Sequence, residues 1–318
     1  MQLNLRKTNG SSSVGLDIDG GFLAAAEVSN GVVSRVASAE MAPGVTRDGE
    51  IADPGALSEE LKEFFRRESL PHSVRLGVAN QQIVVRQIEI PPIENAVERD
   101  AAVRFQAADA VPMPLDDAIL DYQVVEHVIV DGSTRDRVVV VAARESMINQ
   151  LLEAVRGGGL KVEGIDLNAF ALVRTLAGGA GMAQDIAPSQ MARVFCHLGG
   201  VTNLAIAAGS TCMFTRPLTT DWDPETAEVG EIASSLADQI RLSIDFHLNL
   251  PGGRRIEDVL LSGPGAQREG LVEQLDELVV PPVSLAKPLG DLSAYTLPPD
   301  ENPNRYTVAA GLALGASA

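Results

Sequence analysis

The stretch from residue 13 to residue 28 constrains the fold of this chain most. It consists of an apolar run, a turn rich in acidic residues and glycine, and a second apolar run, which is the pattern of a β-hairpin. The turn contains Asp17, Asp19, Gly20 and Gly21. Two glycines let backbone N–H groups converge on a ligand, as in phosphate-binding loops, but a second carboxylate beside the first repels phosphate. The stretch therefore suggests a nucleotide site and argues against a working one.

The same pattern returns in the second part of the chain. Residues 194–208 are again an apolar run, a turn with Gly199 and Gly200, and a second apolar run. Residues 177–192, which precede this hairpin, lack periodicity and are predicted to be a linker. The chain is thus predicted to consist of two halves, each beginning with a hairpin bent around glycines.

Composition limits the classes of function. The chain has 318 residues, enough for two domains, and 45% of them are hydrophobic, as in an ordinary globular protein. A formal net charge of −18 disfavours nucleic acid and direct adsorption to an anionic membrane. The longest apolar run, residues 138–143, is too short to span a bilayer, and two cysteines outside any CxxC pattern fit a reducing compartment. We therefore expect a cytoplasmic protein without direct membrane insertion.

Periodicity and turn residues place the remaining elements. Helices are predicted at residues 55–68, 94–110, 145–156, 169–176, 225–248, 267–278 and 306–314. Strands besides the two hairpins are predicted at residues 31–40, 75–79, 83–90, 119–130, 137–143, 162–167 and 258–262. In the second helix the side chains expected to face inward are Ala101, Ala102, Phe105 and Ala108. Glu126 and His127 are expected at an exposed strand edge.

A third glycine turn, with Gly263 and Gly265, follows the strand at 258–262. Three such turns in two half-chains resemble the actin/Hsp70-type ATPase superfamily, in which one hairpin from each domain holds the phosphates and a third turn holds the nucleoside. The resemblance implies the α/β, actin-like ATPase (ribonuclease H-like) fold. It also implies the following division: a flexible tail at 1–13, a first domain at 14–190 with a β-rich insertion at about 45–145, and a second domain at 191–318. The second domain would have a reduced second subdomain and a C-terminal helix that returns to the first domain.

Motifs in and after the insertion narrow the resemblance to one family, the type IV pilus assembly protein PilM. They lie at residues 84–92, 111–117, 120–125, 141–144, 159–162 and 166–174. The Pro-x-Pro-Leu-Asp-Asp and Leu-Asp-Tyr-Gln-Val patterns separate this family from the cell-division protein FtsA, which has the same architecture. The resemblance extends from about residue 14 to residue 314.

The PilM resemblance implies a cytoplasmic scaffold that is peripheral to the inner membrane. PilM-like proteins bind the N-terminal cytoplasmic peptide of the membrane protein PilN, in a groove between the first domain and its insertion, and connect it with pilus motor or alignment components. Residues 83–92 and 96–105 would line this groove together with strands of the first domain. Two alternatives stay open. One is an active ATP-binding switch of the same fold, and the other is a cytoplasmic component of type II secretion, although that family usually carries a transmembrane helix.

PilM-like proteins commonly bind ATP or ADP with magnesium, but this sequence departs from the family at each nucleotide motif. Asp19 stands where the family has glycine, and Ala24 replaces its lysine. His197 replaces an aspartate in the second turn, and Pro264 replaces a glycine in the third, which removes an N–H donor. An added like charge at about 4 Å costs on the order of 4 kcal/mol at an effective dielectric near 20. ATP or ADP with magnesium is therefore expected to bind weakly or not at all, and neither catalytic residues nor metal ligands are expected.

The residues that would contact a nucleotide belong to the three turns. They are Asp17, Asp19, Gly20, Gly21, Gly199, Gly200, Thr202, Gly263 and Gly265. The two aspartates allow three interpretations: a relic phosphate turn, a bare turn or a functional carboxylate pair. Adjacent strand residues point to opposite faces, so His197 is expected to be a buried, hydrogen-bonded residue rather than a metal ligand shared with Cys196. The segment 218–225 is shorter than the helical excursion of the family, and its Trp222 is expected to anchor a loop.

Overall fold

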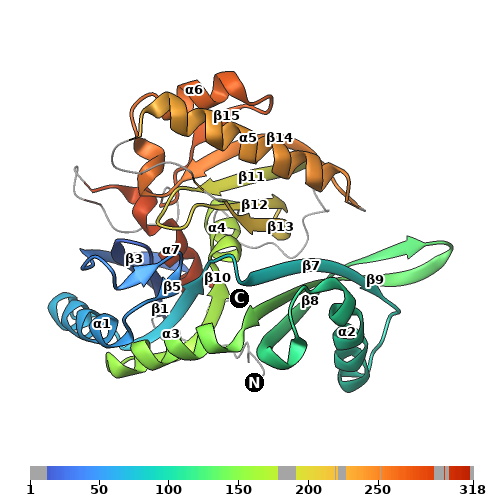
Figure 1. Cartoon of the computed structure of the whole chain (residues 1–318), viewed down its shortest axis with the longest axis horizontal. Helices are drawn as coiled ribbons and strands as arrows, with labels where there is room; N and C mark the ends of the chain where they lie inside the picture. The colour runs from blue at the N-terminus through green and yellow to red at the C-terminus, as the bar shows by residue number, and fades with distance from the viewer. Residues whose placement is uncertain are drawn as a thin grey trace.

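The computed structural model describes residues 13–177, 191–218, 220, 227–250, 252–289, 297 and 301–315. Two five-stranded sheets form its framework (Figure 1). The first sheet has the order β10-β6-β1-β2-β3, with β1 (Ser13–Ile18), β2 (Phe22–Ser29), β3 (Val32–Glu40), β6 (Ser73–Val78) and β10 (Lys161–Leu167). The second has the order β13-β12-β11-β14-β15, with β11 (Met191–His197), β12 (Asn203–Ala208), β13 (Thr211–Pro217), β14 (Arg255–Ser262) and β15 (Val283–Leu285).

Two smaller sheets and the helices complete the fold. The hairpin β4 (Thr46–Arg47) and β5 (Glu50–Ile51) and the three-stranded sheet β7 (Ile83–Ile90), β9 (Ser133–Arg144) and β8 (Ala118–Val130) belong to the first half of the chain. The α-helices are α1 (Pro54–Glu68), α2 (Ala96–Ala110), α3 (Glu145–Gly157), α4 (Asn168–Ala177), α5 (Val229–Leu248), α6 (Leu271–Leu278) and α7 (Thr307–Leu314). The 3-10 helices are η1 (Leu115–Asp117), η2 (Pro264–Gln267) and η3 (Pro303–Tyr306).

The two large sheets share one topology. β1 pairs antiparallel with β2 and parallel with β6, and β11 pairs antiparallel with β12 and parallel with β14. Parallel neighbours need crossover connections, which α1 and α3 provide in the first sheet and α5 and α6 in the second. The turns that follow β1 and β11 therefore occupy equivalent places in the two halves.

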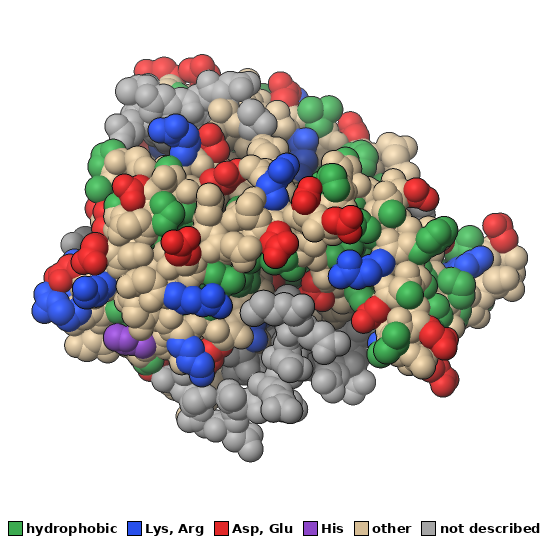
Figure 2. All heavy atoms as spheres, turned by 60° about the horizontal axis from the view of Figure 1, so that its bottom comes forward, with side chains coloured by type: hydrophobic (Ala, Val, Ile, Leu, Met, Phe, Trp, Pro, Cys, Tyr) green, Lys and Arg blue, Asp and Glu red, His purple; other side chains and the backbone are tan. Residues whose placement is uncertain are grey.

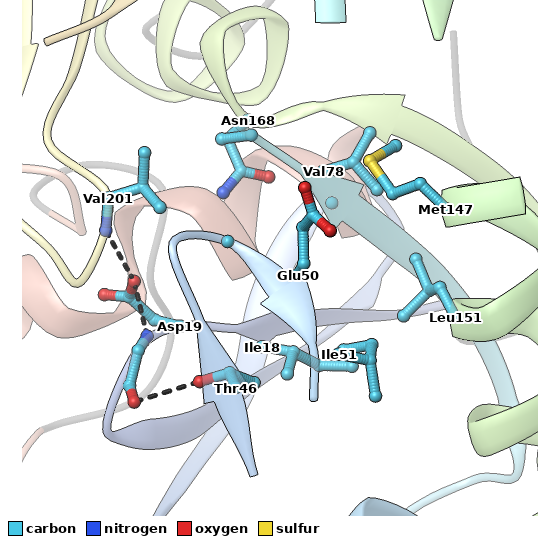
Figure 3. Close-up of a pocket in the computed structure, with 14 residues that line it drawn as sticks. Ile18, Asp19, Thr46, Glu50, Ile51, Val78, Met147, Leu151, Asn168 and Val201 are labelled. Atoms are coloured by element: carbon cyan, nitrogen blue, oxygen red, sulfur yellow. Dashed lines mark hydrogen bonds between the residues drawn. The ribbon is translucent and has the colours of Figure 1, made fainter. Parts of the chain in front are cut away.

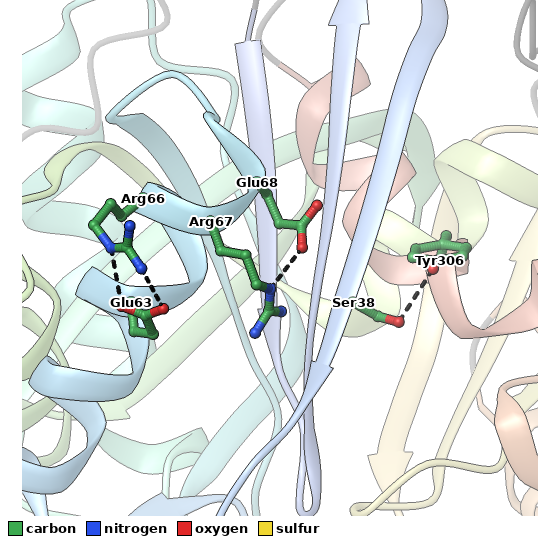
Figure 4. A network of polar contacts seen from close by, with 6 residues as sticks. All are labelled: Ser38, Glu63, Arg66, Arg67, Glu68 and Tyr306. Carbon is green, nitrogen blue, oxygen red and sulfur yellow. Dashed lines mark hydrogen bonds and ion pairs between the residues drawn. The ribbon is translucent and has the colours of Figure 1, made fainter.

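Helix α1 shows how the sequence determines a crossover helix. Asp53 accepts the N–H group of the residue three positions on (2.9 Å), and Pro54 occupies the first turn, where a missing N–H group has no cost. The helix ends at Ser69, which has a left-handed conformation (φ 50°). Its buried face packs on the first sheet with Leu57, Leu61, Phe64 and Phe65. On its exposed face Glu63 and Arg66 form an ion pair (2.7 Å; Figure 4).

Helices α4 and α7 pack together between the two sheets (Figure 1). A Cβ atom added to Gly311 of α7 would lie 2.0 Å from the carbonyl oxygen of Ala171 in α4. A Cβ atom on Gly15 of β1 would lie as close to the carbonyl oxygen of Ala309, so glycine is required at both contacts. In η3, which leads into α7, the Tyr306 hydroxyl donates to Ser38 Oγ of β3 (3.2 Å; Figure 4). The C-terminal segment is thereby attached to the first sheet.

The strands β7, β9 and β8 and the helix α2 form a unit (residues 83–144) that extends to one side of the molecule (Figure 1). The predicted inward face of α2 is wrong, because Val103 and Ala107 pack on the sheet whereas Phe105 is 75% exposed. Alanines occupy several faces of this helix, so its hydrophobic periodicity does not determine which face is buried. Figure 2 shows hydrophobic side chains gathered at the right of the molecule, over this unit. The range of about 45–145 expected for the insertion also contains α1 and β6, which belong to the first sheet and its helical layer.

Most other predicted elements lie within a few residues of their observed bounds. The helix predicted from residue 267 begins instead at Leu271, because residues 264–267 form η2. Strands β4, β5, β13 and β15 were not predicted. The predicted tail (1–13) and linker (177–192) extend too far at their described ends, because Ser13 begins β1, Ala177 ends α4 and residues 191–192 belong to β11. The rest of both ranges and Trp222 lie outside the described part of the chain. Among the helices that the structure describes, none is long and apolar enough to cross a bilayer.

Candidate functional site

Three glycine turns lie where the two halves meet. The first turn (residues 17–21) leads from β1 to β2, the second (197–202) leads from β11 to β12, and the third (263–265) follows β14. The first two turns are in direct contact. A Cβ atom on Gly200 would lie 2.2 Å from the Gly20 nitrogen, and a Cβ atom on Gly20 would lie 2.9 Å from the Gly200 Cα atom. No side chain fits between these two glycines.

Asp19 extends from the first turn into the second (Figure 3). Its Oδ1 atom accepts the N–H groups of Gly20 (2.8 Å) and Val201 (3.3 Å), and the residue is only 8% exposed. A Cβ atom on Gly199 would lie 2.3 Å from Asp19 Oδ2, so the second turn has room for the carboxylate only because glycine stands there. We call this set of contacts the Asp19 bridge.

The third turn is attached to the second. The Leu198 N–H group donates to the Ser262 carbonyl (2.8 Å), and the Gly265 N–H group donates to the Leu198 carbonyl (3.0 Å). Gly263 has a φ of 90°, and a Cβ atom on it would lie 2.5 Å from the same Leu198 oxygen. Pro264 has no N–H group. The Gly265 N–H group is thus engaged in a contact between the third turn and the second.

Two ionisable side chains, Asp17 and His197, are buried beside the turns, and burial favours the uncharged form of each. Burial, together with the nearby Asp19, raises the pKa of Asp17 well above its usual value, although a hydrogen bond from Asn168 (3.4 Å) lowers it. Burial lowers the pKa of His197 from 6.5 to about 4, against a smaller opposite effect of Asp19. His197 Nδ1 and Ser262 Oγ are hydrogen-bonded (3.0 Å), so His197 is the buried, hydrogen-bonded residue that the sequence predicted.

A hollow that is open to solvent adjoins the first turn (Figure 3). It is bordered by the β4–β5 hairpin, the end of β6, helix α3 and Val201. Thr46 in the hairpin donates to the Gly20 carbonyl (3.0 Å). The described residues that line the hollow include the carboxylates of Asp19 and Glu50 but neither lysine nor arginine. Its electrostatics therefore disfavour a phosphate group.

The structure brings most of the predicted site residues together. Asp17, Asp19, Gly20, Gly199 and Gly200 lie at or beside the Asp19 bridge, and Gly263 and Gly265 contact the second turn through Leu198. Gly21 and Thr202 stand apart from it. A Cβ atom on Gly21 would meet no atom within 4 Å, and Thr202 is buried with its carbonyl accepting the Leu218 N–H group (2.8 Å).

Sequence reasoning missed Val201, Asn168 and Ser262. Val201 takes part through its backbone N–H group, which leaves no signal in the sequence. Asn168 and Ser262 are polar residues at or just after strands, a position that marks the ligand-binding edge of parallel sheets. In the part of the chain that the structure describes, no group of three or more His, Cys, Asp or Glu side chains is arranged to hold a metal ion.

Two halves of identical strand order that meet at glycine turns are the architecture of actin-like ATPases, and solved structures of this fold match the chain. A PilM–PilN type IV pilus biogenesis complex matches with a TM-score of 0.79 and 24% identity, over 97% of this chain and 99% of that one. The ethanolamine utilization protein EutJ from Carboxydothermus hydrogenoformans matches with a TM-score of 0.52 and 13% identity, over 98% and 92%. The cytoplasmic domain of EpsL, an inner-membrane component of the type II secretion system of Vibrio cholerae, matches with 0.51 and 12%, over 96% and 94%. The chain thus has the actin-like ATPase fold.

The family is shown by the sequence. The family model of the type IV pilus assembly protein PilM matches residues 15–219, which is more than half of the chain. The chain therefore belongs to the PilM family. No curated protein matches it significantly.

Proposed function

We propose that this chain is a PilM-like scaffold of a type IV pilus assembly machine that binds the N-terminal cytoplasmic peptide of a PilN-type membrane protein and works without a bound nucleotide. Membership in the PilM family supports the role in pilus assembly, and the similarity to a PilM–PilN complex supports a PilN-type partner. The scaffold is held at the cytoplasmic face of the inner membrane by its partner and contacts alignment or motor components. It is a degenerate member of the actin-like ATPase fold and not a hydrolase.

The Asp19 bridge is the observation that carries the nucleotide-free part of this proposal. A phosphate bound between two glycine turns needs their backbone N–H groups as donors. The N–H groups of Gly20 and Val201 already donate to Asp19, and that of Gly265 donates to Leu198. An incoming phosphate would meet a carboxylate at contact distance, with an unfavourable interaction on the order of 4 kcal/mol.

Binding of a fluorescent ATP analogue with Mg²⁺ tests this part against the alternative of an active ATP switch. We expect no saturable binding at micromolar concentrations of protein and analogue. A micromolar dissociation constant, displaced by unlabelled ATP, would overturn the nucleotide-free proposal in favour of the switch. Displacement by ATP distinguishes a nucleotide site from adsorption of the fluorophore.

A second, shallow hollow that is open to solvent is the place we propose for the peptide. It lies between the first sheet, the three-stranded unit and the second sheet. Val78, Ile83, Val85 and Leu167 form its apolar wall, and Arg216 contributes a polar edge. Such a combination is typical of sites that hold a hydrophobic side chain in a fixed orientation. Residues 96–105 of α2, which were expected to line a groove, border neither of the two hollows.

A binding experiment with a synthetic PilN-type N-terminal peptide tests the partner. We expect Val85→Lys to weaken binding at least tenfold, which is about 1.4 kcal/mol, because it places a charge in the apolar wall. Phe105→Lys is the matched control, since its side chain is exposed on α2, and it should leave the affinity unchanged. Loss of binding in Phe105→Lys alone would place the peptide on α2 instead. Absence of binding by the unmodified chain would overturn the proposed partner.

A further inference from the structure

One carboxylate connects the two halves at the turns. Asp19 belongs to the first half, and its Oδ1 atom accepts one N–H group from each turn, those of Gly20 and Val201. Backbone N–H groups that converge on one point form an anion-binding concavity. In this chain the anion at that point is a side chain of the protein itself.

We infer that Asp19 is a built-in anion that holds the two halves closed on each other, so that the closed arrangement forms without any ligand. The inference rests on the proposed nucleotide-free site and adds what joins the turns in the absence of a nucleotide. It gives Asp19 a positioning role and assigns it no chemistry.

The surroundings of Asp19 are shaped to receive it. Gly199 and Gly200 in the second turn leave space for the carboxylate, since Cβ atoms there would lie 2.3 Å from Oδ2 and 2.6 Å from Oδ1. Gly20 allows the backbones of the two turns to touch. None of these three glycines has a positive φ, so the glycines serve close approach rather than an unusual backbone conformation.

The second turn also contacts the small hairpin of the first half (Figure 3). A Cβ atom on Gly49 would lie 2.9 Å from the Val201 side chain. The same hairpin is bonded to the first turn, because Thr46 donates to the Gly20 carbonyl (3.0 Å). Val201 therefore lies between two elements of the first half while its N–H group bonds to Asp19, and closure at the turns involves both polar and apolar contacts.

A separate set of contacts joins the halves away from the turns. Glu126 of the three-stranded unit forms ion pairs with Arg137 (2.7 Å) and with Arg254 of the second half (3.7 Å). The Gln87 amide donates to the Met213 carbonyl of β13 (2.9 Å). Loss of the Asp19 bridge should therefore open the molecule at the turns, whereas these contacts keep the halves associated.

Hydrogen–deuterium exchange measured by mass spectrometry tests the inference on the full chain without ligand. We expect Asp19→Ala to raise the exchange rate of the Val201 amide at least tenfold, and also that of the Gly20 amide. Amides in the interior of β11, such as that of Phe195, should keep the protection of the unmodified chain. Asp238→Ala, at an exposed aspartate of α5, is the matched control and should leave exchange in the turns unchanged.

A second variant separates opening from unfolding. Asp19→Asn keeps the shape and one acceptor oxygen, so the chain should fold and show an intermediate exchange rate at Val201. Faster exchange throughout β11 in both variants would assign Asp19 a general role in stability and overturn the inference, as would unchanged exchange at Val201 in Asp19→Ala. The same measurement on the unmodified chain with Mg-ATP tests the nucleotide-free proposal separately. Added protection of the turns by Mg-ATP would contradict the nucleotide-free proposal, whatever Asp19→Ala does.

Discussion

The first and second turns occupy equivalent places in two sheets of identical strand order, yet their chemistry is complementary. At the end of its first strand, one half has Asp17 and the other has His197. The Asp19 carboxylate of the first turn lies against Gly199 of the second, where a Cβ atom would lie 2.3 Å from an oxygen. The comparison shows that repetition of a fold need not repeat its chemistry. One turn supplies an acceptor, and the other supplies a donor and the space to receive it.

The same comparison explains why both halves bury an ionisable group. Burial raises the pKa of Asp17 and lowers that of His197, so in both groups burial favours the uncharged form. Asp17 Oδ2 and His197 Nε2 are buried without a hydrogen-bond partner among the described residues. Each half thus buries one ionisable group beside the bridge, and burial shifts the two pKa values in opposite directions.

The largest change in the free energy of unfolding is expected where the first and second turns touch. Gly200→Ala should lower the free energy of unfolding by about 4 kcal/mol, because its Cβ atom would lie 2.2 Å from the Gly20 nitrogen and neither backbone can yield without separating the turns. Gly21→Ala is the control in the same region, since a Cβ atom there meets no atom within 4 Å, and it should change stability by less than about 0.5 kcal/mol. Urea unfolding monitored by circular dichroism measures both. Equal effects in the two variants would contradict the direct contact between the turns.

The second-largest effect is the pH dependence of stability that His197 causes. The folded chain excludes a proton from His197 between pH 6.5 and about 4, whereas the unfolded chain binds it, so His197 lowers stability as the pH falls through this window. The stability of the unmodified chain relative to His197→Gln should therefore drop by about 3 kcal/mol between pH 7 and pH 4. Asp17 has the opposite effect, because its raised pKa favours the protonated folded state, and the difference between variants removes its contribution. Urea unfolding at a series of pH values measures this difference, and a difference independent of pH would show that His197 is not held neutral.

A smaller change in stability is expected at the ion pair between Glu126 and Arg254. This contact has no equivalent in the second half, because only the first half contains the three-stranded unit. Glu126→Gln should destabilise the chain by about 1 kcal/mol, since Arg137 keeps Glu89 as an ion-pair partner (3.3 Å). Glu59→Gln, in the exposed pair with Lys62, serves as the surface control and should have less effect than Glu126→Gln. Thermal unfolding monitored by calorimetry measures the two variants. If they were equally stable, the contact of the three-stranded unit with the second half would contribute nothing.

The smallest change in the free energy of unfolding is expected for substitutions on the exposed face of α2. Phe105→Ser should change the free energy of unfolding by less than about 0.5 kcal/mol, because the side chain is 75% exposed. Val103→Ser on the opposite face should cost more than 1 kcal/mol, because Val103 is fully buried against the sheet. Chemical unfolding of the two variants side by side decides which face of α2 is packed. A costly Phe105→Ser together with a neutral Val103→Ser would restore the face that the sequence predicted.

The sequence predicts the framework well, for physical reasons. Hairpins around glycines and strong helical periodicity, as in α1 with Leu57, Leu61 and Phe64, are local signals that survive without tertiary context. The face of α2 could not be predicted, because alanines leave its periodicity weak and packing alone selects Val103. Strand β13 lacks a distinct alternation and β15 has only three residues, so both depend on their neighbours in the sheet.

The sequence predicted most residues of the candidate site but not how they contact one another. The sequence identifies Asp19 as an unusual residue in a glycine turn. It does not reveal that this residue reaches across to Val201, because that contact joins a side chain to a backbone N–H group 182 positions away. Likewise, the need for glycine at position 199 arises from the partner turn and leaves no mark in local propensity.

A side-chain carboxylate has no off-rate. A nucleotide would be loaded, turned over and exchanged, and its occupancy would follow the adenylate pool of the cell. Asp19 is part of the polypeptide from its synthesis, and every chain contains it once. If Asp19 holds the two halves closed as we propose, the shape of the chain does not depend on the nucleotide concentration in the cell.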